Sequence, residues 1–149
     1  MNVIYYGAFD MTGAIEEITS DAGYRTKLEK PVPAPHVTFK FNPEKSEMPW
    51  LLIGEKINVK LIAYGCDGEN EGFLVEILSD DPEIMKLVKE IEKPHVTLST
   101  SRSGKPFNTR FLDFKELDDP INVEMTIGAF IESDWRGGGE NEPTARIIL

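Results

Sequence analysis

Residues of the kinds that build metal centres and disulfides are scarce in this sequence: it has two histidines and one cysteine, Cys66, among 149 residues. One cysteine cannot form a disulfide within the chain, which is typical of a reducing compartment. The first residues show neither a basic start nor a long apolar stretch, so we expect no secretory signal and a cytoplasmic location. No apolar run approaches the ~20 residues of a membrane-spanning helix, so we expect no membrane partner.

Positive charge is also limited. Sixteen Lys and Arg residues against 26 Asp and Glu residues give a formal net charge of −10 and a pI of about 4.7. A protein this acidic, without a basic run, repels the long phosphate backbone of duplex DNA. We therefore expect no duplex DNA partner, and a small nucleotide or short RNA held in one pocket if nucleic acid is bound. The acidity is equally well explained as a feature that keeps the protein soluble.

The hydrophobic pattern predicts a chain dominated by short strands. Hydrophobic residues make up 40% and charged residues 28%, as in ordinary globular proteins, and the length suits a single domain at residues 1–149. Stretches rich in β-branched, aromatic or alternating apolar residues predict strands at residues 2–9, 36–41, 56–64, 73–78, 95–99, 121–132 and 145–149.

Two helices and one hairpin complete this prediction. Residues 10–22 carry a weak helical pattern, and residues 82–92 carry a clear one, with apolar side chains at i, i+3, i+4 and i+7. Asp81 can cap the second helix and Pro82 suits its first position. The glycine-rich segment 65–72 lies between two strands and predicts a hairpin. The sequence therefore predicts an α+β protein with a mainly antiparallel sheet and few helices.

A repeated tetrapeptide is the strongest functional signal. Both histidines lie in the same four-residue word, Pro35-His36-Val37-Thr38 and Pro94-His95-Val96-Thr97. Because alternate side chains of a strand share a face, each copy is expected to place an imidazole and a hydroxyl together and its valine on the opposite, apolar face.

Two imidazoles and two hydroxyls suit phosphodiester chemistry. A neutral imidazole can accept a proton from an attacking oxygen, and an imidazolium can donate one to a leaving oxygen. Threonine hydroxyls can donate hydrogen bonds to phosphate oxygens. We expect neither a metal nor another cofactor, since two histidines and one cysteine are too few for an ordinary zinc site without carboxylates.

The two motifs, His36-Val37-Thr38-Phe39 and His95-Val96-Thr97-Leu98, resemble those of the two-histidine (2H) phosphoesterase superfamily, which includes the bacterial RNA-ligase-like proteins and the cyclic phosphodiesterases. The resemblance implies a two-lobed, pseudo-symmetric arrangement of antiparallel sheets, with few outer helices and a central cleft. It implies His36 and His95 as the acid–base pair, and Thr38 and Thr97 as phosphate-binding residues. The implied substrates are 2′,3′-cyclic phosphates, 2′–5′ linkages or small cyclic nucleotides.

Other residues are candidates for substrate binding. Lys40 and Ser99 follow the two motifs on the same strand faces, Arg102 lies in the loop after the second motif, and one of the tyrosines of the first strand, which we take as Tyr6, is expected to reach the cleft. Weaker candidates, for which a surface or packing role is favoured, are Arg25, Trp50 and Trp135.

The prediction from the sequence is thus a monomeric hydrolase, a metal-independent phosphodiesterase acting on a nucleotide or RNA end. The main alternative is a non-catalytic module that binds a nucleotide or RNA end in the same cleft. A ligation enzyme is disfavoured because no nucleotidyl-lysine motif is present. The repeat could also be coincidental in an interaction domain, and separation of the two histidines would indicate that.

Overall fold

All strands that the structure describes belong to one antiparallel sheet. The computed structural model describes residues 2–24, 28–133 and 144–149. The eight strands are β1 (Asn2–Phe9), β2 (Lys30–Pro31), β3 (His36–Phe41), β4 (Lys56–Cys66), β5 (Asn70–Ile77), β6 (His95–Thr100), β7 (Lys115–Ser133) and β8 (Thr144–Ile148). The helices of the described residues are α1 (Ala14–Asp21) and α2 (Pro82–Val88), with short 3₁₀ helices η1 (Lys45–Glu47), η2 (Trp50–Leu52) and η3 (Pro106–Phe111). The predicted α+β class with mainly antiparallel sheet is confirmed.

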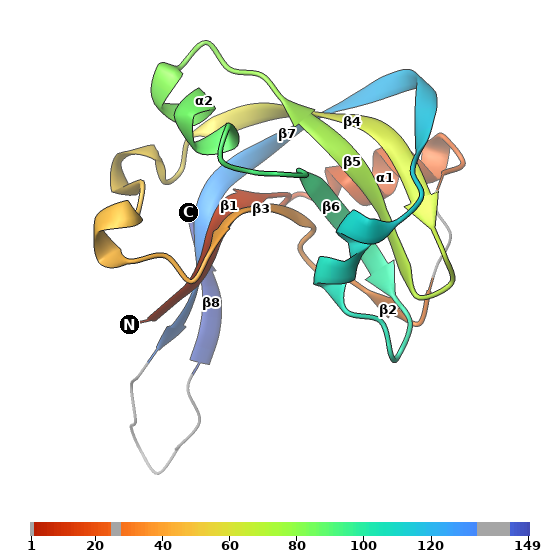
Figure 1. Cartoon of the computed structure of the whole chain (residues 1–149), viewed down its shortest axis with the longest axis horizontal. Coiled ribbons are helices and arrows are strands. Elements are labelled where there is room, and N and C mark those ends of the chain that lie inside the picture. The colour runs from red at the N-terminus through yellow and green to blue at the C-terminus, as the bar shows by residue number, and fades with distance from the viewer. Residues whose placement is uncertain (1, 25–27, 134–143) are drawn as a thin grey trace.

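The strand order is β2-β6-β5-β4-β7-β1-β3, with β8 added to β7. The long strand β7 joins two groups of strands: its first part pairs with β4 and its last part with β1, and Thr126 pairs with both. Although β3 and β6 lie near opposite ends of this order, they contact each other. The sheet therefore curls until these two strands lie side by side, as Figure 1 shows for β3 (orange) and β6 (green).

An irregularity in β7 lets the sheet accept a proline. Leu61 of β4 pairs with Ile121 of β7, whereas Ala63 pairs with Glu116, so residues 117–120 of β7 lie opposite the single residue Ile62 of β4. Pro120 lies in this bulge, where its missing N–H removes no ladder hydrogen bond. Because of the bulge, β7 begins at Lys115, six residues before the strand predicted at 121–132.

An aspartate side chain accepts hydrogen bonds at the start of each of these α-helices, although the N-cap residue of α1 is Gly13. Asp10 accepts hydrogen bonds from the backbone N–H groups of Ala14 (3.3 Å) and Ile15 (2.9 Å) at the start of α1. Asp81 accepts from the N–H of Glu83 (2.9 Å) at the start of α2, as the sequence predicts. These bonds satisfy N–H groups that have no partner inside the helix.

The second helix is shorter than the predicted 82–92. It ends at Val88, and the next turns tighten, since the N–H of Glu90 donates to Leu87 O and that of Ile91 to Val88 O. Pro94 disfavours helical geometry at the residue before it, so the chain must leave the helix early to enter β6.

The core lies between the inner faces of the curled sheet and the helices. Its fully buried members come from many strands and include Ala8, Val37, Leu61, Phe73 and Val96. The valine of each repeated motif is thus a core residue, as predicted, and it anchors the strand that carries the motif histidine. Within the described residues, no helix has the length and apolar character to cross a bilayer.

Candidate functional site

The two repeated motifs meet at one pocket. His36 and Thr38 of β3 and His95 and Thr97 of β6 all line a pocket of about 600 Å³. The pocket is formed where the curl of the sheet brings β3 beside β6. It is lined by Tyr5, His36, Thr38, Phe39, Phe41, Glu90, Ile91, Glu92, Lys93, His95, Thr97, Pro106, Phe107 and Arg110.

Each imidazole is oriented by the segment that leads into its strand. Nδ1 of His36 lies 3.1 Å from Ala34 O, and Nδ1 of His95 lies 2.9 Å from Lys93 O. A carbonyl oxygen only accepts, so Nδ1 donates in both rings, and in the neutral form the lone pair is on Nε2. Neither Nε2 has a hydrogen-bond partner among the residues that the structure describes. Each Nε2 is therefore available to exchange a proton with a ligand.

The surroundings of both rings favour the neutral form. Burial lowers the pKa of His36, the hydrogen bond to Ala34 opposes this shift, and the charge of His95 lowers the pKa further. Burial also lowers the pKa of His95, and the cations Arg110 and Lys93 add to the effect. The two imidazoles therefore lie close enough for the charge of His95 to act on His36.

A glycine lies opposite the threonine of each motif. Gly7 of β1 pairs with Thr38, and Gly72 of β5 pairs with Thr97, and in both strands the pairing register shifts just before the glycine. A Cβ at Gly7 would lie 2.0 Å from Val37 O, and one at Gly72 would lie 2.3 Å from Val96 O. Only glycine permits this close approach, so these two residues set the position of the motif strands.

Aromatic rings support the first histidine. The Tyr5 ring stacks on the His36 ring with centroids 4.7 Å apart, and Phe9 lies 5.5 Å from His36. Tyr5 also stacks on Phe41 and Phe130. Burial raises the pKa of Tyr5 to about 12, so its hydroxyl stays protonated at neutral pH. The stack limits the rotation of the imidazole and gives this side of the pocket an apolar wall.

Charges are unevenly distributed around the pocket. Lys93 and Arg110 act on His95, whereas Glu90 acts on Lys40 and Tyr6, on the side of β3. The cations therefore gather beside the second histidine, where an anion would be attracted although the whole protein carries −10.

The four predicted substrate-binding residues, Tyr6, Lys40, Ser99 and Arg102, are not among the residues that line this pocket. Tyr6 is 2% exposed and packs against Phe39 in the core, because neighbouring residues of a strand point to opposite faces; Tyr5 lines the pocket instead. Ser99 is fully buried, and its hydroxyl donates to Glu71 at 2.8 Å.

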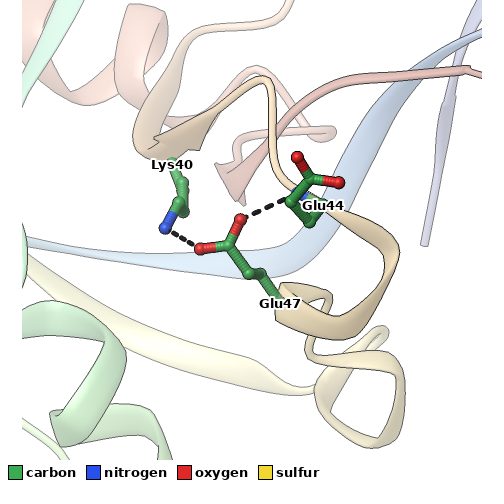
Figure 2. A network of polar contacts seen from close by, with 3 residues as sticks. All are labelled: Lys40, Glu44 and Glu47. Atoms are coloured by element: carbon green, nitrogen blue, oxygen red, sulfur yellow. Dashed lines mark hydrogen bonds and ion pairs between the residues drawn. The ribbon is translucent and has the colours of Figure 1, made fainter.

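The two predicted cations are held by carboxylates outside the pocket. Lys40 donates to Glu47, whose other oxygen accepts from the backbone N–H of Glu44 at 2.8 Å, as Figure 2 shows. Arg102 forms an exposed ion pair with Glu29 at 3.4 Å. The partner of Lys40 lies in the 3₁₀ helix η1, and the partner of Arg102 lies in a loop. The alternation of residues in a strand does not predict contacts with such segments.

Several residues of the pocket were missed from the sequence. Phe107 and Arg110 come from η3, a short 3₁₀ helix without a periodic signal, and Phe41 ends β3 with a ring that is 69% exposed. The sequence offered no cue for these residues, because the exposure of a large aromatic side chain, which indicates a binding surface, is visible only in the structure.

The weaker candidates do not contribute to this pocket as described. Trp50 lines a second hollow with Met48 and Asn42, and Arg25 and Trp135 lie outside the described residues. Within the described ranges, no three His, Cys, Asp or Glu side chains come together as metal ligands would.

Comparison of the sequence with protein families and with curated proteins finds no match.

Proposed function

We propose that the protein is a metal-independent phosphodiesterase that acts on a nucleotide or RNA end, with His36 and His95 as its acid–base pair. The observation that carries the proposal is that both imidazoles, from strands far apart in the sheet order, line one pocket with Nε2 unpaired within the described chain. The resemblance of the two motifs to the 2H phosphoesterases supports 2′,3′-cyclic phosphates, 2′–5′ linkages or small cyclic nucleotides as substrates.

The reaction needs one imidazole in each protonation state. The neutral ring accepts a proton through Nε2 from a water molecule as the water oxygen bonds to phosphorus. The bond from phosphorus to the leaving oxygen breaks, and the imidazolium donates its Nε2 proton to that oxygen. Each transfer typically contributes ~10²–10⁴-fold to the rate. The rings then exchange protons with solvent and regain their starting states.

Since catalysis uses both histidines, we expect a bell-shaped dependence of kcat/KM on pH, at a position set by their lowered pKa values. The active form carries one proton on the pair, so kcat/KM of the free protein should reach its maximum below the ordinary histidine value of 6.5. An anionic substrate would favour uptake of that proton, because the cations Arg110 and Lys93 would be neutralised.

We also propose the two-lobed, pseudo-symmetric form of the fold that the resemblance implies. Its support is that the pair β1–β3 and the pair β5–β6 repeat the same features: a glycine opposite the motif threonine, a register shift before it, and an Nδ1 bond to the carbonyl two residues earlier. If the proposal is right, superposing β1–β3 on β5–β6 overlays the two imidazoles.

The test is a hydrolysis screen with purified protein. The panel contains 2′,3′-cyclic mononucleotides, 2′–5′-linked oligonucleotides and small cyclic nucleotides. We expect turnover of at least one of them and loss of about 10²–10⁴-fold in kcat/KM for either His36→Ala or His95→Ala. Arg102→Gln, which changes an exposed ion pair away from the pocket, is the matched control and should remain active.

The variants also separate the alternatives. The double variant should lose little more than each single variant, because one imidazole without the other cannot complete the proton transfers. Tight binding of a nucleotide without turnover would identify the non-catalytic module instead. Full activity of either single variant would rule out the proposed pair.

A further inference from the structure

The two motif threonines are not equivalent. The Thr38 hydroxyl has no hydrogen-bond partner among residues 2–24, 28–133 and 144–149 and lines the pocket. In contrast, Thr97 Oγ1 donates to Pro106 O at 3.0 Å and is hydrogen-bonded to Thr109 Oγ1 at 2.8 Å, and both partners belong to η3. The hydroxyl proton of Thr97 is therefore already used inside the protein.

The Thr97 hydroxyl cannot easily give up these hydrogen bonds to contact a phosphate. A phosphate oxygen only accepts hydrogen bonds, so Thr97 could bind it only by releasing its proton from η3. Thr97 is 6% exposed and Thr109 is fully buried, so the contact between the two hydroxyls is shielded from water, and turning the Thr97 hydroxyl toward a ligand would remove its bond to Pro106 O.

Other buried polar groups hold the same element. Asn70 of β5 is 2% exposed, and its Nδ2 donates to Lys105 O at 2.7 Å and to Thr109 Oγ1 at 3.1 Å. Consequently η3 is fastened to β5 and β6 by side chains from both strands, as its position in front of β6 in Figure 1 illustrates.

The 3₁₀ helix η3 places a cation at the pocket. Arg110 of η3 lines the pocket, has no ion-pair partner among the described residues, and lies with Cζ 4.7 Å from the centre of the Phe111 ring. A guanidinium group has five N–H donors in a planar fork that fits two phosphate oxygens at once.

We propose that Thr97 is a positioning residue that fixes η3 through its buried hydroxyl, and that Arg110 of η3 binds the anionic group of the ligand beside His95. Only the identity of that anion as a phosphodiester rests on the proposed function. Thr38 then contacts the anion directly, whereas the second motif acts on it through η3.

The positioning role is tested on the free protein by NMR. Thr97→Val should speed amide exchange in η3 and raise the pKa of His95, because the repelling Arg110 moves away while Lys93 stays. Thr97→Ser keeps the hydroxyl and should restore both properties, and Thr38→Val is the matched control that should change neither. If Thr97→Val does not fold, Thr109→Val removes the hydrogen bond between Thr97 and Thr109 from the η3 side and should give both changes in the same direction.

The anion-binding role is tested with inorganic phosphate as the probe. Arg110→Gln should weaken phosphate binding about tenfold or more, and Thr97→Val should weaken it together with the changes in η3. Loss of phosphate binding in Thr97→Val with unchanged η3 exchange and an unchanged His95 pKa would mean that the hydroxyl contacts the anion, and would overturn the proposal. Unchanged phosphate binding in Arg110→Gln would also overturn it. No turnover enters these measurements, so absence of hydrolysis would contradict the proposed function alone.

Discussion

Substitution of Gly7 by alanine should destabilise the protein and displace the first motif. The added Cβ would lie 2.0 Å from Val37 O, 3.0 Å from Val37 C and 3.1 Å from Thr38 Cα, all of them backbone atoms. Ordinary contact with a Cβ begins at 3.4 Å, so β1 and β3 must separate by more than an ångström at the point where β3 carries the motif.

The magnitude follows from the cost of overfilling a packed site. Such substitutions cost roughly 1–3 kcal/mol, occasionally more, and here no flexible side chain can yield. We therefore expect a loss of about 3 kcal/mol in the free energy of unfolding. For a chain of this size that corresponds to a fall of roughly 6–12 °C in Tm.

Urea unfolding and the NMR signals of the His36 ring measure both effects. Gly68→Asn is the control, because Gly68 has a positive φ of 87°, which asparagine tolerates, and open space around it. Gly72→Ala should behave like Gly7→Ala, since its Cβ would meet Val96 O at 2.3 Å. An unchanged unfolding midpoint together with an unchanged His36 spectrum in Gly7→Ala would refute the reasoning.

Four further outcomes are expected. Burial lowers the pKa of His36 and His95 in the folded protein, so near pH 6 the unfolded chain binds more protons, and the free energy of unfolding should decrease as the pH falls below 6.5; urea midpoints should show a weaker dependence for a His36→Gln variant. Ser99→Ala removes a hydrogen bond to the buried Glu71 carboxylate and should cost about 1–3 kcal/mol in a thermal melt while kcat/KM stays unchanged. Lys40→Met should leave kcat/KM unchanged, since Lys40 is not among the residues that line the pocket. A large loss of kcat/KM would show that Lys40 contacts the substrate. Hydrolysis should survive dialysis against a chelator, and a loss restored by a divalent ion would contradict the paired-imidazole mechanism.

Local rules account for the parts of the fold that the sequence predicts well. The strands 2–9 and 36–41 match β1 and β3, and Asp81 with Pro82 starts α2, because alternation and capping depend on residues close together in the chain. The same rules place the motif valines in the core. Ends of elements are less predictable: the turn of the β4–β5 hairpin shortens to three residues because Asp67 accepts hydrogen bonds from the N–H groups of Glu69 and Asn70.

The composition and the alternation of apolar and polar residues were enough to determine an antiparallel α+β protein. The same alternation determined that two strand faces each carry an imidazole and a hydroxyl. Tertiary structure decided what covers each face. Ser99 follows the same alternation as His95, yet β2 pairs with β6 at this residue and Ser99 is buried against Glu71. Arg110 reaches the pocket only because η3 folds back onto β6. A strand pattern reports which side chains share a face, whereas the curl of the whole sheet, set by bulges and close glycine contacts, selects the faces that meet.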